Sequence, residues 1–75
     1  MDWREHVIVD PEICHGQACF KGTRILVTTV LDNLAAGISA VEIITSYPAL
    51  SEPAIKAAIS YAAELAREQV RAIPG

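Results

Sequence analysis

Three amphipathic segments with separate start and stop signals fill residues 28–72, and this feature constrains the fold most. In the first segment, apolar residues recur with the spacing of one helix face; they are Val27, Val30, Leu31, Leu34, Ala35 and Ile38. Thr28 or Thr29 can cap the start of this helix, and Gly37 suits the left-handed conformation that commonly follows a helix end. The pattern predicts a helix that ends just before Gly37.

The second segment lies between Ser39 and Pro48. Ser39 and Glu42 have the spacing of a capping box, in which each side chain accepts a hydrogen bond from the backbone N–H of the other residue. Proline disfavours helical conformation in the residue before it, so the helix is predicted to stop at Tyr47. Its expected apolar face consists of Val41, Ile44 and Tyr47.

The third segment starts at Ser51, followed by Glu52 and Pro53 in the first turn. A carboxylate and a residue without an N–H group are both favourable at that position. The expected inward stripe consists of Ile55, Ala58, Ile59, Ala62, Leu65 and Ala66. A helix of about 20 residues spans about 30 Å. Its C-terminal half is therefore expected to extend beyond the core of one chain.

Residues 1–27 contain two short β-branched runs, Val7–Val9 and Ile25–Val27, separated by a loop. Such short strands are marginal alone, so we expect them to pair with each other or with a second copy and to rest on the helices. The sequence thus predicts a mainly α fold, in which an arm with a short β element of two strands precedes a three-helix bundle of helix-turn-helix layout at residues 28–72. We expect one domain over residues 1–75. A three-helix bundle that does not touch DNA has the same spacing.

Apolar residues make up 52% of the 75 residues, and charged residues only 20%. A chain of this size buries roughly 60% of its unfolded surface on folding, so part of the apolar surface is expected to face a second copy or a partner. The net charge of −3 and pI of 5.1 argue against nucleic-acid binding by bulk charge, because phosphate contacts need Lys and Arg. No apolar run reaches the length of a membrane span, and the N-terminus lacks the order of a signal peptide. We therefore expect a cytoplasmic protein without a membrane partner.

The densest group of chemically active residues comprises Cys14, His15 and Cys19, with His6 upstream. These residues could ligate zinc, but structural zinc sites usually contain two closely spaced ligand pairs, which this spacing lacks. In a reducing cytosol both cysteines are expected to be thiols, and no metal or other cofactor is expected. Cys14 and His15 are chain neighbours that point apart in an extended segment. With no Ser-His-Asp arrangement either, we predict no catalytic residue and do not expect an enzyme.

The segment KGTR at residues 21–24 places two cations and a hydroxyl on a tight turn. Lys21 and Arg24 could hold a phosphate or a carboxylate, although the segment lacks the glycine spacing of a phosphate-binding P-loop. In the opposing interpretation, Arg24 is an internal pin that forms an ion pair with Asp10 or Glu12.

DNA reading by a helix-turn-helix protein needs Arg, Lys, Asn or Gln at the front of the third helix. Only Lys56 and Ser60 suit a duplex at this front, and Glu52 repels phosphate. Contacts would then come largely from the N-terminal arm, and a dimer would double them. The predicted DNA-binding residues are Lys21, Thr23, Arg24, Ser51, Lys56 and Ser60.

Four segments occur in the order found in one family: VDPEICHG at 9–16, FKGTRI at 20–25, AAGIS at 35–39 and ITSYPAL at 44–50. Over roughly residues 7–66 the chain resembles domain-of-unknown-function family 433, small bacterial and archaeal proteins regarded as VapB-like antitoxins. The resemblance implies a homeodomain-like three-helix fold, pairing with a PIN-like ribonuclease toxin, and repression of the protein's own operon. Two features differ from the family pattern: Leu26 stands where proline is usual, and few residues follow the third helix, where an antitoxin often carries an extended tail.

The resemblance, the helix-turn-helix layout and the apolar surplus lead to one functional prediction. The protein is expected to be an antitoxin that forms a homodimer, covers a PIN-like ribonuclease toxin and binds operator DNA. The predicted partner-binding residues are Leu65, Arg67, Val70 and Arg71. An arginine of this group would replace the charge of the metal in the toxin's acidic site. The alternative, favoured by the acidic pI and the weak recognition helix, is a homo-oligomeric interaction module without a DNA role.

Overall fold

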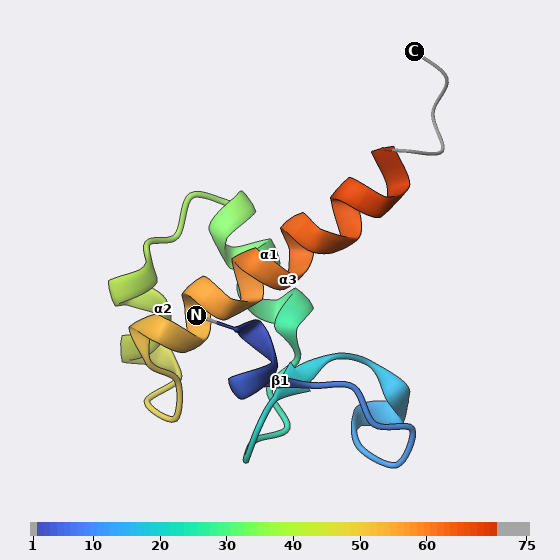
Figure 1. Ribbon diagram of the computed structural model, residues 1–75. Coiled ribbons are helices and arrows are strands. Elements are labelled where there is room, and N and C mark those ends of the chain that lie inside the picture. The colour runs from blue at the N-terminus through green and yellow to red at the C-terminus, as the bar shows by residue number, and fades with distance from the viewer. Residues whose placement is uncertain (1, 71–75) are drawn as a thin grey trace.

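Three helices make up most of the chain, and two short strands precede them (Figure 1). The computed structural model describes residues 2–70, and the side chains of residues 2–67. The elements in chain order are the 3-10 helix η1 (Trp3–Glu5), strand β1 (Val7–Ile8), the short 3-10 element η2 (Cys14–Gly16), strand β2 (Cys19–Phe20), and helices α1 (Val27–Ala35), α2 (Ala40–Ser46) and α3 (Glu52–Val70). The predicted mainly α fold with a two-stranded N-terminal β element is confirmed. None of the described helices has the length and apolar character that a membrane span needs.

The two strands form an antiparallel pair, in which Val7 lies opposite Phe20 and Ile8 lies opposite Cys19. Val7, Phe20 and Cys19 are buried, with exposed fractions of 3%, 2% and 0%. The strand pair is therefore part of the hydrophobic core, and it anchors the arm to the helices.

The predicted second strand, Ile25–Val27, is wrong. The partner of β1 is Cys19–Phe20, and of the predicted run only Leu26 joins the sheet region, through an isolated bridge to Cys19. The chain reverses tightly at Gly22, where φ is +77°, and this returns the Ile25 carbonyl to accept the Phe20 N–H at 3.0 Å. Val27 is already the first residue of α1, so the apolar run is divided between a turn and a helix.

Helix α1 begins without a side-chain cap. The predicted caps, Thr28 and Thr29, are wrong because both lie inside the helix, and the N-cap position is occupied by Leu26, which has no side-chain acceptor. The predicted end of the helix is confirmed: Gly37 has φ of +89°, a left-handed conformation that glycine adopts at little steric cost.

The capping box at the start of α2 is confirmed. The Ser39 hydroxyl accepts the Glu42 N–H at 3.2 Å, and the Glu42 carboxylate accepts the Ser39 N–H at 3.4 Å. The helix ends before Tyr47, the residue that precedes Pro48, as the sequence predicted. The prediction that Val41 belongs to the apolar face is wrong, because 70% of Val41 is exposed.

Helix α3 is the element on which the others pack, since η1, β1, α1 and α2 all contact it. The buried core cluster consists of Val7, Phe20, Val27, Val30, Ile43, Leu50, Ala54, Ile55, Ala57 and Ala58. The predicted inward stripe of α3 is only partly right: Ala54 and Ala57 are buried, whereas Ile59 is 49% exposed. The small alanine side chains let neighbouring elements approach α3 closely, and this turns the core-facing side of the helix away from Ile59.

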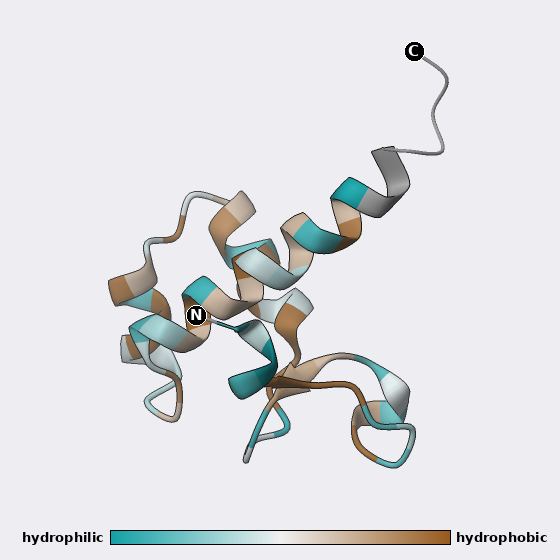
Figure 2. Cartoon of the chain, viewed as in Figure 1, coloured by the Kyte–Doolittle hydropathy of each residue, from teal (hydrophilic) through white to brown (hydrophobic). Residues whose placement is uncertain are grey.

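The C-terminal half of α3 projects from the rest of the molecule, as predicted from its length (Figure 1). Hydrophobic and hydrophilic residues follow one another along this projecting half (Figure 2). Leu65 lies there and is 44% exposed, although the sequence pattern placed it in the inward stripe. On α3 the buried core cluster reaches only to Ala58, so the same chain covers Leu65 only in part.

The N-terminal helix η1 is held on α3 by aromatic and polar contacts that the sequence pattern did not indicate. The Trp3 indole Nε1 donates to Glu64 Oε2 at 2.6 Å, and its ring meets Tyr61 edge-on with 4.8 Å between ring centroids. The Arg4 guanidinium carbon lies 4.5 Å from the centre of the Trp3 ring, a cation–π distance. Through these contacts Glu64 helps to hold the N-terminus on α3.

The Ser39 cap gives a direct test of the helix boundaries. Ser39→Ala removes the acceptor of the Glu42 N–H and should lower the free energy of unfolding by about 1 kcal/mol. For a domain of this size, the melting temperature should fall by about 4–8 °C. Circular dichroism melts would measure the change. Ser46→Ala, at the exposed end of the same helix, is the control, and an equal loss in both variants would contradict the role of the cap.

Candidate functional site

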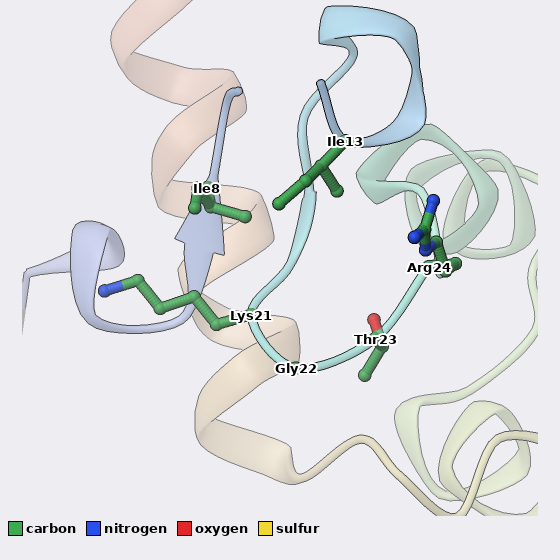
Figure 3. Close-up of a pocket in the computed structure, with 6 residues that line it drawn as sticks. All are labelled: Ile8, Ile13, Lys21, Gly22, Thr23 and Arg24. Atoms are coloured by element: carbon green, nitrogen blue, oxygen red, sulfur yellow. The ribbon is translucent and has the colours of Figure 1, made fainter. Parts of the chain in front are cut away.

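A hollow of about 250 Å³ lies at the turn that follows β2 (Figure 3). Its lining combines two apolar and four turn residues: Ile8, Ile13, Lys21, Gly22, Thr23 and Arg24. The three DNA-binding residues predicted in the arm therefore lie together, on one turn. The apolar side of the hollow comes from β1 and from the segment that leads to η2.

Thr23 fixes the shape of this turn. Its hydroxyl donates to the Phe20 carbonyl at 2.8 Å and accepts the Ile25 N–H at 3.0 Å, while its own N–H also donates to the Phe20 carbonyl at 3.0 Å. The hydroxyl is thus engaged on both sides within the chain. Thr23 positions its neighbours, and its side chain is not a free contact for DNA.

Lys21 and Arg24 are the exposed cations of the turn, and neither forms an ion pair within the residues whose side chains are described. The predicted bridge from Arg24 to Asp10 or Glu12 is wrong. The Asp10 carboxylate instead accepts the Glu12 N–H at 2.8 Å, which closes a local turn and satisfies this carboxylate. The two cations point to opposite sides of the turn (Figure 3), an arrangement suited to two neighbouring anionic groups.

The front of α3 is less available to DNA than the turn. Ser51 caps the helix, since its hydroxyl accepts the Ala54 N–H at 3.3 Å. The Lys56 ammonium lies 3.8 Å from the Glu52 carboxylate, one helical turn away, and Ser60 is half-buried. No hydrogen bond or ion pair among the described side chains joins these three predicted residues to the arm.

An apolar groove of about 420 Å³ runs between the loop from η2 to β2, helix α1 and the middle of α3. Its walls include Gly16, Gln17, Leu31, Tyr61, Ala62 and Leu65. The sequence pattern did not predict the groove, because its walls come from three segments that only the fold brings together. The apolar surplus of the composition was the available signal.

Of the four predicted partner-binding residues, the structure describes the side chains of Leu65 and Arg67. Leu65 is in its wall, and Arg67 is exposed on the same projecting half of α3. Val70 is the last residue of α3, and its side chain lies outside the described residues, as does the whole of Arg71.

The residues weighed as zinc ligands do not form a metal site in the described part of the chain, which contains no group of three or more His, Cys, Asp or Glu able to hold an ion. Cys14 and Cys19 are both free thiols, as predicted. Burial, and next the neighbouring Cys14 thiol, raise the pKa of the Cys19 thiol above its usual value.

The sequence profile of the family described as "Protein of unknown function (DUF433)" matches residues 7–62, so the chain belongs to this family. The crystal structure of a DUF433 member protein from Anabaena variabilis ATCC 29413 is similar, with a TM-score of 0.75 and 29% sequence identity. The similarity covers 87% of this chain and 64% of that one, so this chain spans less than two thirds of that protein's length. No match was found among curated proteins.

The structural role of Thr23 can be tested by stability. Thr23→Val removes both hydroxyl hydrogen bonds and leaves the Ile25 N–H without its acceptor. The free energy of unfolding should therefore fall by about 1–2 kcal/mol. Thr23→Ser keeps the hydroxyl and should stay close to the wild type in chemical denaturation. Thr28→Val, at an exposed position of α1, is the matched control. A Thr23→Val variant as stable as the wild type would show that the hydroxyl does not hold the turn.

Proposed function

We propose that the protein is the antitoxin of a toxin–antitoxin pair, which binds and occludes a PIN-like ribonuclease toxin. The observation that carries the proposal is the projecting half of α3, with exposed Leu65 beside the apolar groove. A small chain gains stability by burying apolar surface, and exposed apolar surface next to a groove is typical of a protein-binding site. The resemblance of the sequence to VapB-like antitoxins supports the choice of partner.

Occlusion follows from the position of the groove on one side of α3. A toxin segment that fills the groove would bury Leu65 and Tyr61. Arg67 is exposed on the other side of α3, so a toxin that also wraps around the projecting half of the helix would contact it. Nucleases of the PIN-like kind hold metal in an acidic site, so a guanidinium placed there would compensate the carboxylates in place of the metal. Arg71, four residues after Arg67, would be a second candidate for this contact.

Binding of operator DNA, as a dimer, is the second part of the proposal. Its support is the pair of cations Lys21 and Arg24, which project from one turn without a carboxylate partner in the described residues. Two copies of the turn would be needed, because one chain carries a net charge of −3 and offers few phosphate contacts. In this arrangement the turn contacts phosphates, while the α3 front, with Lys56 paired to Glu52, contributes less.

Toxin binding is tested with Leu65→Asp. Co-expression of the wild-type protein with the product of the adjacent gene should rescue growth, and the two proteins should co-purify with the ribonuclease inhibited. Burying a leucine contributes about 1.5–3 kcal/mol, so the dissociation constant for Leu65→Asp should rise by about 10- to 100-fold or more.

Val41→Asp is the matched control, since it makes the same substitution at an apolar residue that is 70% exposed on α2, away from the groove. It should inhibit the ribonuclease like the wild type. No rescue and no complex with the wild-type protein would overturn the proposal. If the protein instead forms an oligomer that only Leu65→Asp disrupts, the groove binds a second copy and the protein is a homo-oligomeric interaction module.

DNA binding is tested by a gel shift with the promoter of the protein's own operon over a range of salt concentrations. Lys21→Ala should weaken binding, and the slope of log K against log salt concentration should fall by about 1 for each lost phosphate contact. Lys56→Ala changes the net charge equally but removes a cation already paired with Glu52, so its effect should be smaller. Equal losses in both variants, or no binding at low salt, would contradict a DNA role for the turn.

A further inference from the structure

Three consecutive residues of η2 have left-handed backbone conformation. The φ angles are +52° for Cys14, +56° for His15 and +82° for Gly16. Glycine adopts this conformation freely, but for Cys and His it is sterically unfavourable and uncommon. Backbone strain of this kind is concentrated at functional positions, so this turn is a candidate for a functional role.

The strained turn directs the Cys14 side chain onto the segment beside β2. Its sulfur lies 3.7 Å from the Arg24 carbonyl oxygen, two residues before the Leu26 that bridges Cys19. Cys19 is fully buried, between Ile8 on one side and Leu26 on the other. Both cysteines therefore lie against the same segment, residues 24–26, with Cys14 half-buried and Cys19 buried.

Burial, and next the neighbouring Cys14 thiol, raise the pKa of the Cys19 thiol. Because Cys19 is fully buried and Cys14 is only half-buried, Cys14 is the thiol that a dissolved reagent meets first.

We propose that Cys14 and Cys19 are a redox-active pair that a hydroperoxide oxidises to an intramolecular disulfide. The Cys14 thiolate attacks one peroxide oxygen, the O–O bond breaks, and the departing oxygen takes up a proton to leave as an alcohol, or as water from hydrogen peroxide. The Cys19 sulfur then attacks the resulting Cys14 sulfenic acid, the S–O bond breaks, and the hydroxyl leaves with the Cys19 proton as water. In total, two thiols lose two electrons and two protons, and one hydroperoxide is reduced.

The position of the pair gives the oxidation a structural consequence. Gly16 of the strained turn lines the apolar groove, and Arg24, whose carbonyl Cys14 contacts, lines the hollow with Lys21. A disulfide with its S–S distance of about 2.05 Å would join η2 covalently to β2. We therefore expect oxidation to affect the hollow at the turn and the apolar groove together.

The experiment is a titration of the reduced, full-length protein with a small excess of hydrogen peroxide. Free thiols should fall from two per chain to none, the intact mass should fall by two hydrogens, and the protein should stay monomeric on a non-reducing gel. A dithiol reductant should restore both thiols. In amide spectra, Gly16 and Gly22 should shift on oxidation, whereas Gly37, at the end of α1, should not.

Single-cysteine variants separate the two roles. Cys19→Ala should yield a Cys14 sulfenic acid that a dimedone reagent traps, and Cys14→Ala should leave Cys19 unreacted in the folded protein, with folding checked by circular dichroism. Disulfide-linked dimers of the wild type, or a wild type in which Cys14 is oxidised to the sulfinic acid while Cys19 remains a thiol, would overturn the proposal.

Discussion

The packing of η1, β1, α1 and α2 on α3 is the contact on which the structure depends. One face of α3 has only small side chains, those of Ala54, Ala57 and Ala58, and each of the three has an exposed fraction of 6% or less. The neighbouring elements pack on α3 from several sides. Phe20, brought in by β2, and Ile55 supply the volume that the alanines lack. A larger residue at the alanine positions would force the elements apart, because interiors are close-packed. Strand β1, the first two helices and η1 therefore share α3 as their anchoring helix.

This arrangement also explains the surface that remains. The buried residues of α3 lie in its first half, and the second half projects with Leu65 exposed beside the groove. The turn held by Thr23 carries the cations Lys21 and Arg24, which form no ion pair among the described side chains. The groove and the cationic turn are thus two separate places on the surface. One suits a protein partner and the other suits anionic groups.

Local signals in the sequence predicted the helices well, because caps and proline act within a few residues. The Ser39 box and the ends of α1 and α2 are examples. The sequence misplaced the second strand, since a strand of two residues such as Cys19–Phe20 has no periodic pattern and only the turn at Gly22 selects it. The prediction that Ile59 belongs to the inward stripe of α3 was wrong for a similar reason. Which face of the helix is buried depends on the elements that pack on it, whereas a hydrophobicity pattern assigns large apolar residues to the core before alanines. Of the site, the cationic turn was predicted from its residues, whereas the groove depends on three distant segments.

The central claim is that the groove and the projecting half of α3 are the surface that the ribonuclease partner covers. Amide hydrogen exchange of the protein, alone and in complex with the purified product of the adjacent gene, tests it most directly. The account predicts slower exchange at residues 59–67 and at the α1 wall of the groove, with no change in α2, where exposed Val41 lies. Protection confined to α2, or an exchange pattern that the partner leaves unchanged, would contradict it.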